Sequence, residues 1–398
     1  MFENVKAIPG DALLALMVAF KSDPNPNKID LGVGVYKNDS GQTPILNVVK
    51  KAETHLLEHE QSKGYIGATG APELASLLQG LMLGNDHPII QQGRIATAQT
   101  PGGTGALRVA GDLINAVNPD AKIWVSDPTW SNHFHVFAGA GVEVRTYPYY
   151  DTDHNALAID AMLESIRQIP AGDVILLHAS CHNPTGIDPT QAQWQLISQA
   201  VAEQGLVPLI DCAYQGFGEG LEEDVRGLKM LLDLCPEALI TTSCSKNFGL
   251  YNERIGALSL VTESAEHCQR AFSQVANCIR ANYSNPPAHG AAIVTTILSD
   301  QSLRQQWETE LAEMRDRIRR MRSELVSSLQ SLNCNRDFSF IEQQKGMFSY
   351  SGLSKDEVLY LREHYGIYAV ESGRINVAGI NDRNLELLSE AINKAIQQ

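Results

Sequence analysis

The stretch of sequence from Gly93 to Val261 restricts the possible folds of this chain more than any other. Short apolar runs alternate there with longer segments of helical periodicity. A parallel sheet covered on both faces is built from strands that are apolar throughout. The alternation therefore predicts an α/β domain with a mostly parallel sheet between helices. The expected strands are Ile95–Gln99, Ile123–Ser126, Val142–Tyr147, Val174–Ala179, Leu206–Asp211, Leu239–Ser243 and Ile255–Val261.

The remaining sequence predicts a second, smaller domain. Apolar residues between Leu303 and Leu332 recur at steps of three and four, the pattern of one long amphipathic helix that can bridge two domains. A strand at Met347–Tyr350 and a helix opened by the capping box Ser354-x-x-Glu357 then indicate a small α+β unit. We therefore expect an N-terminal arm over residues 1–12, a small domain over 13–43 and 314–398 with the bridging helix at about 300–332, and a large domain over 44–313.

The start of the chain gives two local expectations. Asp11 is expected to cap a short apolar helix from Ala12 to Phe20. The segment Ile29–Tyr36 is expected to be a strand. Its glycines at positions 32 and 34 indicate a close approach by a ligand or by another backbone segment.

The composition narrows the functional class. The net charge of the 398-residue chain is −15, from 46 acidic and 31 basic residues, which argues against nucleic acid or an anionic membrane as a partner. No apolar run approaches the roughly 18 residues of a membrane span, and the N-terminus lacks the features of a signal peptide. Seven cysteines without a C-x-x-C pair indicate reduced thiols, as expected for a cytoplasmic protein.

Lys246 lies just after the expected strand Leu239–Ser243, among small hydroxyl residues. Burial or a neighbouring cation lowers the pKa of a lysine until its amine can attack a carbonyl and form a Schiff base. Ser243, Ser245 and Arg254 supply the hydroxyls and the cation that suit a phosphate dianion. Pyridoxal 5′-phosphate carries both a carbonyl and a phosphate. A strand-end turn with a solvated lysine explains this segment alone equally well.

Other strand ends also carry groups suited to a ligand, and ligands bind at the carboxyl ends of parallel strands. The glycine-rich turn Thr100–Leu107 opens a helix, whose free amides form an anion site. A dinucleotide fold could use the same glycines, although the G-x-G-x-x-G spacing is absent. Asn183 precedes Pro184, is forced to be extended, and directs its amide above the sheet. Cys181 and His182 do not suit a thiol nucleophile, because neighbours in an extended chain point apart.

A carboxylate ends another of these strands. Asp211 follows the apolar run Val207–Ile210 and must be paired if it is buried. A pyridinium nitrogen is one possible partner, held as part of an electron sink, and Tyr214 could donate to the phenolic oxygen of the same ring. A salt bridge to an arginine or a lysine is the alternative, and Asp211 taken alone favours it. The joint occurrence of such groups at four strand ends of one sheet favours the cofactor.

The sequence resembles the class I pyridoxal-phosphate aminotransferases, in the subgroup of aspartate and aromatic-amino-acid aminotransferases. The resemblance extends over essentially the whole chain. It implies a fold-type I enzyme, in which a large domain has a mostly parallel seven-stranded sheet between helices and a small α+β domain is added. It also implies a homodimer with shared active sites. The segments that carry it are Gln99–Leu107, Cys181–Gly186, Ala213–Phe217, Ser245–Arg254 and Arg280–Pro287.

The resemblance implies a role toward the cofactor for each of these residues. Lys246 is similar to the lysine that holds the cofactor as a Schiff base and moves the proton, and Asp211 to the partner of the ring nitrogen. Tyr214 and Asn183 match the groups on the phenolic oxygen, and Trp130 matches the indole stacked on the ring. Asn183 and Trp130 also face the substrate in such a site. The residues implied to surround the phosphate are Gly103, Thr104, Ser243, Arg254 and, from a second subunit, Tyr65.

The substrate carboxylates have their own implied partners. Arg374 is similar to the arginine that binds the α-carboxylate through two hydrogen bonds, with the backbone of Gly34 closing over it. Arg280 matches a second arginine, which the partner subunit provides to the distal carboxylate. The peptides Asp127-Pro128 and Asn183-Pro184 lie where this family often has cis bonds.

The resemblance implies transamination between L-aspartate and 2-oxoglutarate, which forms oxaloacetate and L-glutamate. Gly64 departs from the asparagine usual in the aspartate branch and leaves space for aromatic side chains. Phenylalanine, tyrosine and tryptophan are therefore expected as second substrates, and an aromatic-amino-acid aminotransferase is the alternative function. The residues that resemble the aspartate branch are Val35, Lys37, Thr43, Thr104 and Asn285.

Three other functional classes fit the sequence less well. A lyase or decarboxylase on the same scaffold would not need Arg280 opposite Arg374. A sensor domain of a transcription regulator would require an N-terminal DNA-binding module, and residues 1–40 have neither the length nor the basic charge for one. A dinucleotide-dependent dehydrogenase would require the glycine spacing that is missing here.

Overall fold

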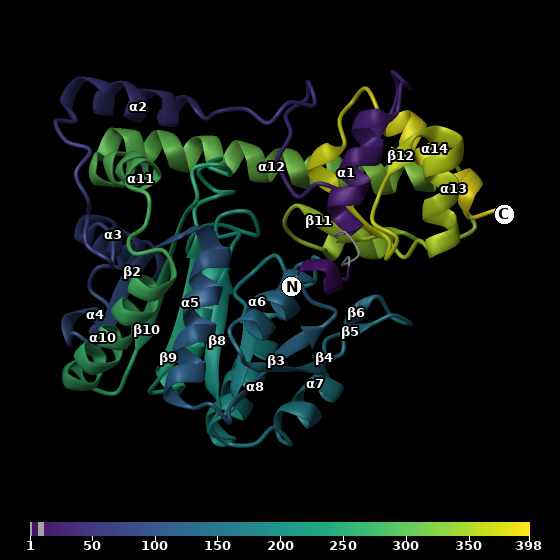
Figure 1. Ribbon diagram of the computed structural model, residues 1–398. Helices are drawn as coiled ribbons and strands as arrows, with labels where there is room; N and C mark the ends of the chain where they lie inside the picture. The colour runs from purple at the N-terminus through teal and green to yellow at the C-terminus, as the bar shows by residue number, and fades with distance from the viewer. Residues whose placement is uncertain (1, 7–11) are drawn as a thin grey trace. The chain divides into compact units, whose positions relative to one another are not determined.

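The computed structural model describes residues 2–6 and 12–398, which form two compact units (Figure 1). The large unit comprises Pro44–Asp316, and the small unit comprises the described residues up to Thr43 together with Arg317–Gln398. The boundary falls within helix α12 (Gln301–Ser331), where the sequence predicts one long helix. The domain assignment made from the sequence stays a prediction. None of the described helices is long and apolar enough to span a membrane.

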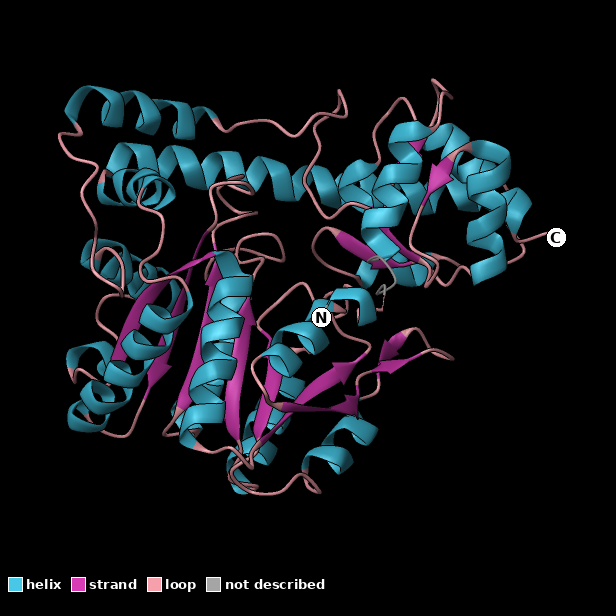
Figure 2. Cartoon of the chain, viewed as in Figure 1, coloured by secondary structure: helices cyan, strands magenta, loops and turns pink. Residues whose placement is uncertain are grey.

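A seven-stranded sheet organises the large unit (Figure 2). Its strands lie in the order β2-β10-β9-β8-β7-β3-β4. Strand β10 is antiparallel to both of its neighbours and all other pairs are parallel, which confirms the expected α/β fold with a mostly parallel sheet. The strands are β2 (Ile95–Pro101), β3 (Lys122–Asp127), β4 (Glu143–Pro148), β7 (Val174–His178), β8 (Val207–Cys212), β9 (Ala238–Ser243) and β10 (Ile255–Val261).

Helices cover the sheet on both sides (Figures 1 and 2). Helix α8 begins at a capping box in which Thr190 and Gln193 bond to each other's backbone. Besides the first part of α12, the large unit contains α2 (Asn47–His59), α3 (Pro72–Leu83), α4 (Pro88–Gln91), α5 (Gly102–Val117), α6 (Asn132–Gly139), α7 (Ile159–Ile166), α8 (Gln191–Glu203), α9 (Arg226–Leu234), α10 (Ala265–Asn282) and α11 (His289–Ser299), with the short pieces β5 (Tyr150–Asp151), β6 (Ala156–Leu157) and η2 (Glu223–Val225).

Two separate cores pack against the two faces of the sheet. Alternate residues of a strand point to opposite faces. Leu176 and Leu209 therefore join the core that includes α5, α6 and α10, whereas Ile175 and Ile210 join the core that includes α7, α8 and α9. Every residue of β7, β9 and β10 is buried as a result. The edge strand β4 buries only Tyr147. Burial on both faces is why the central strands read as continuous apolar runs.

The small unit packs helices around two two-stranded sheets. Helix α13 begins at the expected capping box, in which Ser354 and Glu357 exchange hydrogen bonds. The cap expected at Asp11 lies outside the described residues. The strands are β1 (Ile29–Asp30) parallel to β12 (Ile367–Tyr368) and β11 (Phe348–Tyr350) antiparallel to β13 (Arg374–Asn376). The helices are α1 (Ala12–Ser22), α13 (Lys355–Tyr365), α14 (Leu385–Ala395) and the last part of α12, with η1 (Phe2–Asn4), η3 (Ser339–Gln343) and η4 (Val377–Gly379).

The expected strand Ile29–Tyr36 is wrong beyond its first two residues. The carboxylate of Asp30 accepts the backbone N–H of Gly32 at 3.0 Å and of Val33 at 3.3 Å. A side chain that captures backbone donors competes with strand pairing, so the chain turns after Asp30. The side-chain amide of Asn376 then donates to the carbonyl of Val33 at 2.6 Å. After Leu31, which still forms backbone hydrogen bonds with Tyr368 and Asn376, side-chain hydrogen bonds therefore help to hold the segment.

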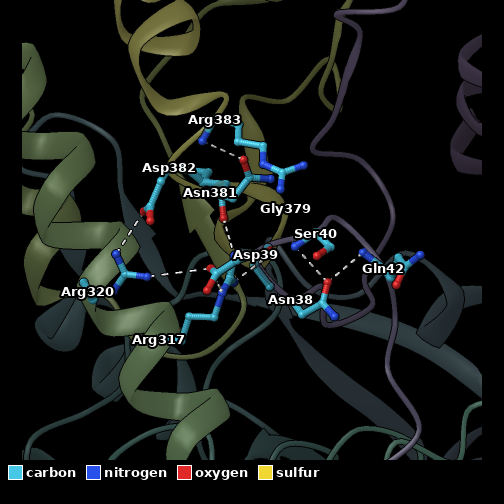
Figure 3. Close-up of polar contacts among 12 residues, drawn as sticks. Asn38, Asp39, Ser40, Gln42, Arg317, Arg320, Gly379, Asn381, Asp382 and Arg383 are labelled. Atoms are coloured by element: carbon cyan, nitrogen blue, oxygen red, sulfur yellow. Dashed lines mark hydrogen bonds and ion pairs between the residues drawn. The ribbon is translucent and has the colours of Figure 1, made fainter.

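An ion-pair cluster within the small unit fastens the next turn (Figure 3). Asn38 Oδ1 accepts two backbone N–H groups of the turn, both at 3.0 Å. Asp39 Oδ1 lies 2.7 Å from Arg317 Nε, and Arg317 Nη2 donates at 2.8 Å to the carbonyl of Ile380. Arg320 lies 3.7 Å from the same oxygen of Asp39. These contacts hold the end of the segment that contains Gly34.

Candidate active site

The polar residues predicted at the ends of β7, β8 and β9 lie side by side at one edge of the sheet. The strand register pairs His178 with Asp211 and Asp211 with Thr241. Thr241 Oγ1 donates to Asp211 Oδ1 at 3.1 Å. Because β8 and β9 are parallel, the segments that follow them, with Tyr214 and Lys246, start from this same edge.

Lys246 is half-buried above the ring of Tyr214. Its Nζ lies 4.7 Å from the centre of the phenol ring, and Tyr214 itself is buried. Burial lowers the pKa of the Lys246 amine; the Asp211 carboxylate opposes this change and the Arg254 guanidinium adds to it. The sequence left open whether this lysine is simply solvated. The structure shows an amine with a lowered pKa held over an aromatic ring.

Asp211 is a buried carboxylate whose partners are neither lysine nor arginine. No salt bridge joins it to an arginine or a lysine within residues 2–6 and 12–398. Its Oδ2 lies 3.4 Å from His133 Nε2 instead. Burial alone would raise the pKa of Asp211, but the contact with His133 and the charge of Lys246 lower it below its usual value. The lowered pKa keeps the Asp211 carboxylate ionised at neutral pH.

A cluster of buried histidines beside Asp211 was not predicted from the sequence. His133 Nδ1 lies 2.8 Å from Thr129 Oγ1, which is 3.4 Å from His178 Nε2. The rings of His178 and His182 are 4.3 Å apart. Burial, together with the charge of His133, lowers the pKa of His178 to about 3. His178 is therefore neutral at physiological pH. A histidine at the end of a buried strand was the one signal that could have revealed the cluster.

His182 belongs to this cluster and does not serve Cys181 as a base. Its Nε2 lies 2.8 Å from Ser126 Oγ and its Nδ1 lies 2.8 Å from Thr185 Oγ1. Both ring nitrogens are therefore occupied by hydroxyl groups. Burial lowers the pKa of His182 well below its usual value. The contacts agree with the expectation that the two neighbours do not form a nucleophilic pair.

An anion cradle is formed where β2 passes into α5. Gly102 and Gly103 begin the helix close to Arg254 and Ser243, and the first amides of a helix have no partner within it. A Cβ on Gly102 would lie 2.4 Å from Arg254 Nη2, and a Cβ on Gly103 would lie 3.1 Å from the Cβ of Ser243. Gly102 also has φ +75°, a backbone conformation that favours glycine. Backbone amides at a helix N-terminus, a hydroxyl and a guanidinium are the donors that a phosphate dianion requires. Thr104 follows in the first turn of α5.

Trp130 and Asn183 lie close to the same edge. Trp130 is half-buried and meets the ring of His133 edge-on, with centroids 5.3 Å apart. Asn183 is buried, and its side-chain oxygen has no hydrogen-bond partner within the described residues. A buried polar atom without a partner is costly unless a ligand binds it. The peptides Asp127-Pro128 and Asn183-Pro184 are both cis, as the resemblance implied.

Four further predicted residues have surroundings of their own. Tyr65 is 98% exposed, and Arg280 lies on the exposed side of α10, where it donates to Ser284. Arg374 and Gly34 belong to the small unit, where they lie close to the same aromatic ring. The guanidinium of Arg374 lies 4.3 Å from the ring centre of Phe348. A Cβ on Gly34 would lie 2.7 Å from the same ring.

The groups at the sheet edge fit a ligand that carries a phosphate, a basic ring nitrogen and an aldehyde. The cradle supplies donors for the phosphate, Asp211 a carboxylate for a protonated ring nitrogen, and Lys246 an amine for the aldehyde carbon. Asn183 supplies the buried polar atom that lacks a partner. Pyridoxal 5′-phosphate has all of these features. The donor set therefore fits this cofactor.

Comparison with known proteins agrees with this cofactor. Residues 26–392 match the family model for aminotransferases of class I and II. The chain is 55% identical to an aspartate aminotransferase of Salmonella typhi, over 98% of this chain and 99% of that protein. It is 47% identical to an aromatic-amino-acid aminotransferase of Pseudomonas aeruginosa, over 98% of both chains. A solved aromatic-amino-acid aminotransferase of Burkholderia pseudomallei, covalently bound to pyridoxal phosphate, is 46% identical over 99% of both chains, with a TM-score of 0.97.

Proposed function

The chain belongs to the class I and II aminotransferases, and from this premise we propose that it transfers amino groups between L-aspartate and 2-oxoglutarate with pyridoxal phosphate as cofactor. Its architecture is that of the fold-type I enzymes that depend on this cofactor. The observation that carries the proposal is the half-buried Lys246 amine at the same sheet edge as Asp211. Aromatic amino acids are proposed as additional donors. An enzyme acting mainly on them is the second candidate, favoured by Gly64 and by the relative of Pseudomonas aeruginosa.

The residues at the sheet edge are proposed to hold the cofactor in one orientation. When bound, pyridoxal phosphate supplies a ring that withdraws electrons from the substrate's Cα–H bond. Asp211 would keep a proton on its ring nitrogen, and Tyr214 and Asn183 would contact its phenolic oxygen. Trp130 would cover one face of the ring. The phosphate would be held by Gly103, Thr104, Ser243 and Arg254, with Tyr65 contributed by a second subunit.

Lys246 is proposed to be both the attachment point and the general base. Its amine would be released when the substrate amine takes its place, and it would then accept the proton from Cα. The lowered pKa of Lys246 favours the unprotonated amine that this step requires. Lys246 would move a proton in each half of the reaction. The donor would leave as a 2-oxo acid before the acceptor binds. Ping-pong kinetics are therefore expected.

Two arginines are proposed to read the two carboxylates of a dicarboxylic substrate. Arg374 is buried over the ring of Phe348, and its Nη2 donates to the carbonyl of Gly32 at 2.6 Å. The guanidinium is thereby oriented to bind an α-carboxylate, with Gly34 beside it. Arg280 is exposed on α10 and would bind the distal carboxylate in the site of a partner subunit.

Arg280→Ala is expected to reduce kcat/KM for aspartate by about 100-fold, because a carboxylate that is desolvated without its cation loses several kcal/mol. The loss for phenylalanine should be no more than about threefold, since an aromatic side chain makes no ion pair. Steady-state assays of both amino acids with 2-oxoglutarate measure this difference. Arg270→Ala is the matched control, because Arg270 is an exposed arginine on the same helix. Equal losses for the two substrates would contradict the role of Arg280. If the wild-type enzyme itself acted only on aromatic donors, the second candidate function would be favoured.

We also propose a homodimer in which each site takes residues from both subunits. Tyr65 is 98% exposed and Leu57 is 86% exposed, and large apolar side chains exposed together mark interaction surfaces. Tyr65 and Arg280, which match active-site residues in the sequence, contact none of the sheet-edge residues in the described part of the chain. A second subunit would bring them to the site.

Mixed dimers test this sharing of sites. When Lys246→Ala subunits are refolded together with Tyr65→Phe/Arg280→Ala subunits, each mixed dimer has one site with no substitution. Random mixing should therefore restore about a quarter of wild-type activity. Mass spectrometry of the dimers measures the extent of mixing. Proven mixed dimers without recovered activity would show that each site belongs to one chain.

The proposed location is the cytoplasm. All seven cysteines are free thiols, and five of them are buried. Structural disulfides are rare in the reducing cytoplasm and common in oxidising compartments. The free thiols therefore support this location.

A further inference from the structure

The loop that follows Tyr214 wraps around a buried carboxylate that the roles proposed above do not use. Asp224 in η2 is 5% exposed, and its two carboxylate oxygens accept four backbone N–H groups of this loop. No lysine or arginine in the described parts of the chain forms an ion pair with it. Burial raises the pKa of the Asp224 carboxyl, and the four N–H groups oppose this change. The donors are Gly216 at 2.8 Å, Gly218 at 2.9 Å, Glu219 at 2.7 Å and Gly220 at 3.4 Å.

Two glycines of this loop lie close to neighbouring side chains. Gly216 has φ +94°, and a Cβ on it would lie 2.4 Å from Leu311 Cδ2. A Cβ on Gly218 would lie 2.5 Å from Asp224 Oδ1. Glycine is required at the first position by its positive φ and at the second by the contact with the carboxylate. The loop is thus built to converge on Asp224.

A hydrogen bond joins this loop to the lysine segment. Asn247, which follows Lys246, donates from Nδ2 to the backbone carbonyl of Gln215, which follows Tyr214, at 3.3 Å. The carbonyl of Asn247 accepts the indole N–H of the fully buried Trp307 at 2.7 Å. The side-chain oxygen of Asn247 has no hydrogen-bond partner among the described residues. The side-chain contact that the structure gives for this amide is therefore its donation to Gln215.

We infer that Asp224 and Asn247 are positioning residues, which together fix the phenol of Tyr214 relative to the amine of Lys246. Asp224 holds the loop that begins at Tyr214, and Asn247 ties that loop to the residue next to the lysine. The inference rests on the proposed function, because the position of Tyr214 relative to Lys246 matters only if both side chains act on the same cofactor. A displacement of about 1 Å at a reacting group can cost about 100-fold in rate. Loosening this support should therefore lower turnover more than substrate binding.

The test is Asn247→Leu in the full-length holoenzyme, a change that keeps the shape of the side chain and removes its donors. The kcat for aspartate should fall about tenfold, while KM changes less than about twofold. The pH midpoint of the cofactor's visible absorbance should shift by at least about 0.5 unit, because the amine changes its surroundings. Asp224→Asn should change both quantities in the same way. Glu222→Gln, a neighbouring carboxylate paired with Lys229 at the surface, should change neither.

Two results would overturn the inference. One is a folded Asn247→Leu enzyme with wild-type kcat and absorbance midpoint, even if its thermal unfolding temperature falls, since that outcome marks a purely structural role. If Asp224→Asn does not fold, the Asn247→Leu result decides. The other is found by acylation of Lys246, and it is needed if the wild-type chain proves not to be a transaminase. The pH dependence of Lys246 acylation is then compared between the cofactor-free wild type and Asn247→Leu, where a shift supports the positioning role and identical profiles refute it.

Discussion

Lys246→Ala is expected to reduce the kcat for aspartate at least about 10⁴-fold, because in the proposed reaction one amine both binds the cofactor and moves the Cα proton. The half-buried Nζ over the ring of Tyr214 leads to this expectation. Borohydride reduction of the wild-type holoenzyme should fix the cofactor covalently to the peptide that contains residue 246. The same treatment of the variant should label no peptide. Kinetics and peptide mapping by mass spectrometry measure the two effects.

A surface lysine provides the control for this variant. Lys229 pairs with Glu222 outside the site, so Lys229→Ala should retain wild-type kcat and wild-type labelling. The pH dependence of acylation gives a second test in the cofactor-free protein. Because burial lowers the pKa of the Lys246 amine, an acylating reagent should modify it at a pH below the value of about 10.4 for a free lysine. If borohydride reduction of the wild type fixed the cofactor to a lysine other than Lys246, the assignment would be refuted.

The fold of the large unit could be predicted because its strands are buried on both faces. Burial of every residue in β7, β9 and β10 produces continuous apolar runs that separate clearly from the helices between them. The small unit was harder. Its strands have two or three residues, and the apolar segment after Ile29 leaves the strand as soon as Asp30 captures backbone donors. Local competition of this kind leaves no mark in hydrophobic periodicity.

The candidate site was predictable to the extent that topology alone brings residues together. The carboxyl ends of parallel strands meet at one edge, so Asp211 and Lys246 could be expected near each other before any side chain was placed. The residue that contacts Asp211 could not be predicted in this way. His133 reaches it from α6, and the contact between Ser126 and His182 spans 56 residues of sequence. Contacts of this kind depend on tertiary packing, for which a single sequence has no local signal.

The surroundings of Asp211 determine how large a contribution to turnover we expect from it. A buried carboxylate is costly unless its charge is compensated. In the protein chain the compensation comes from Thr241, from His133 at 3.4 Å and from the nearby Lys246. These contacts lower the pKa of Asp211, so its charge persists at neutral pH and is available to a protonated ring nitrogen. In the proposed site, removing the carboxylate would remove the anion that keeps that proton.

Asp211→Ala is therefore expected to lower kcat for aspartate about 10³-fold, the scale found when a preorganised electrostatic partner is removed from a reaction centre. Cofactor binding should persist, because the cradle of Gly103, Ser243 and Arg254 is separate from residue 211. Phosphate analysis of the purified variant and steady-state kinetics measure the two quantities. Asp233→Ala, at an exposed aspartate on α9, is the control and should match the wild type. If the Asp211 variant kept more than about a tenth of wild-type kcat, its carboxylate would not be the group that holds the ring proton, and His133 would be the next residue to replace.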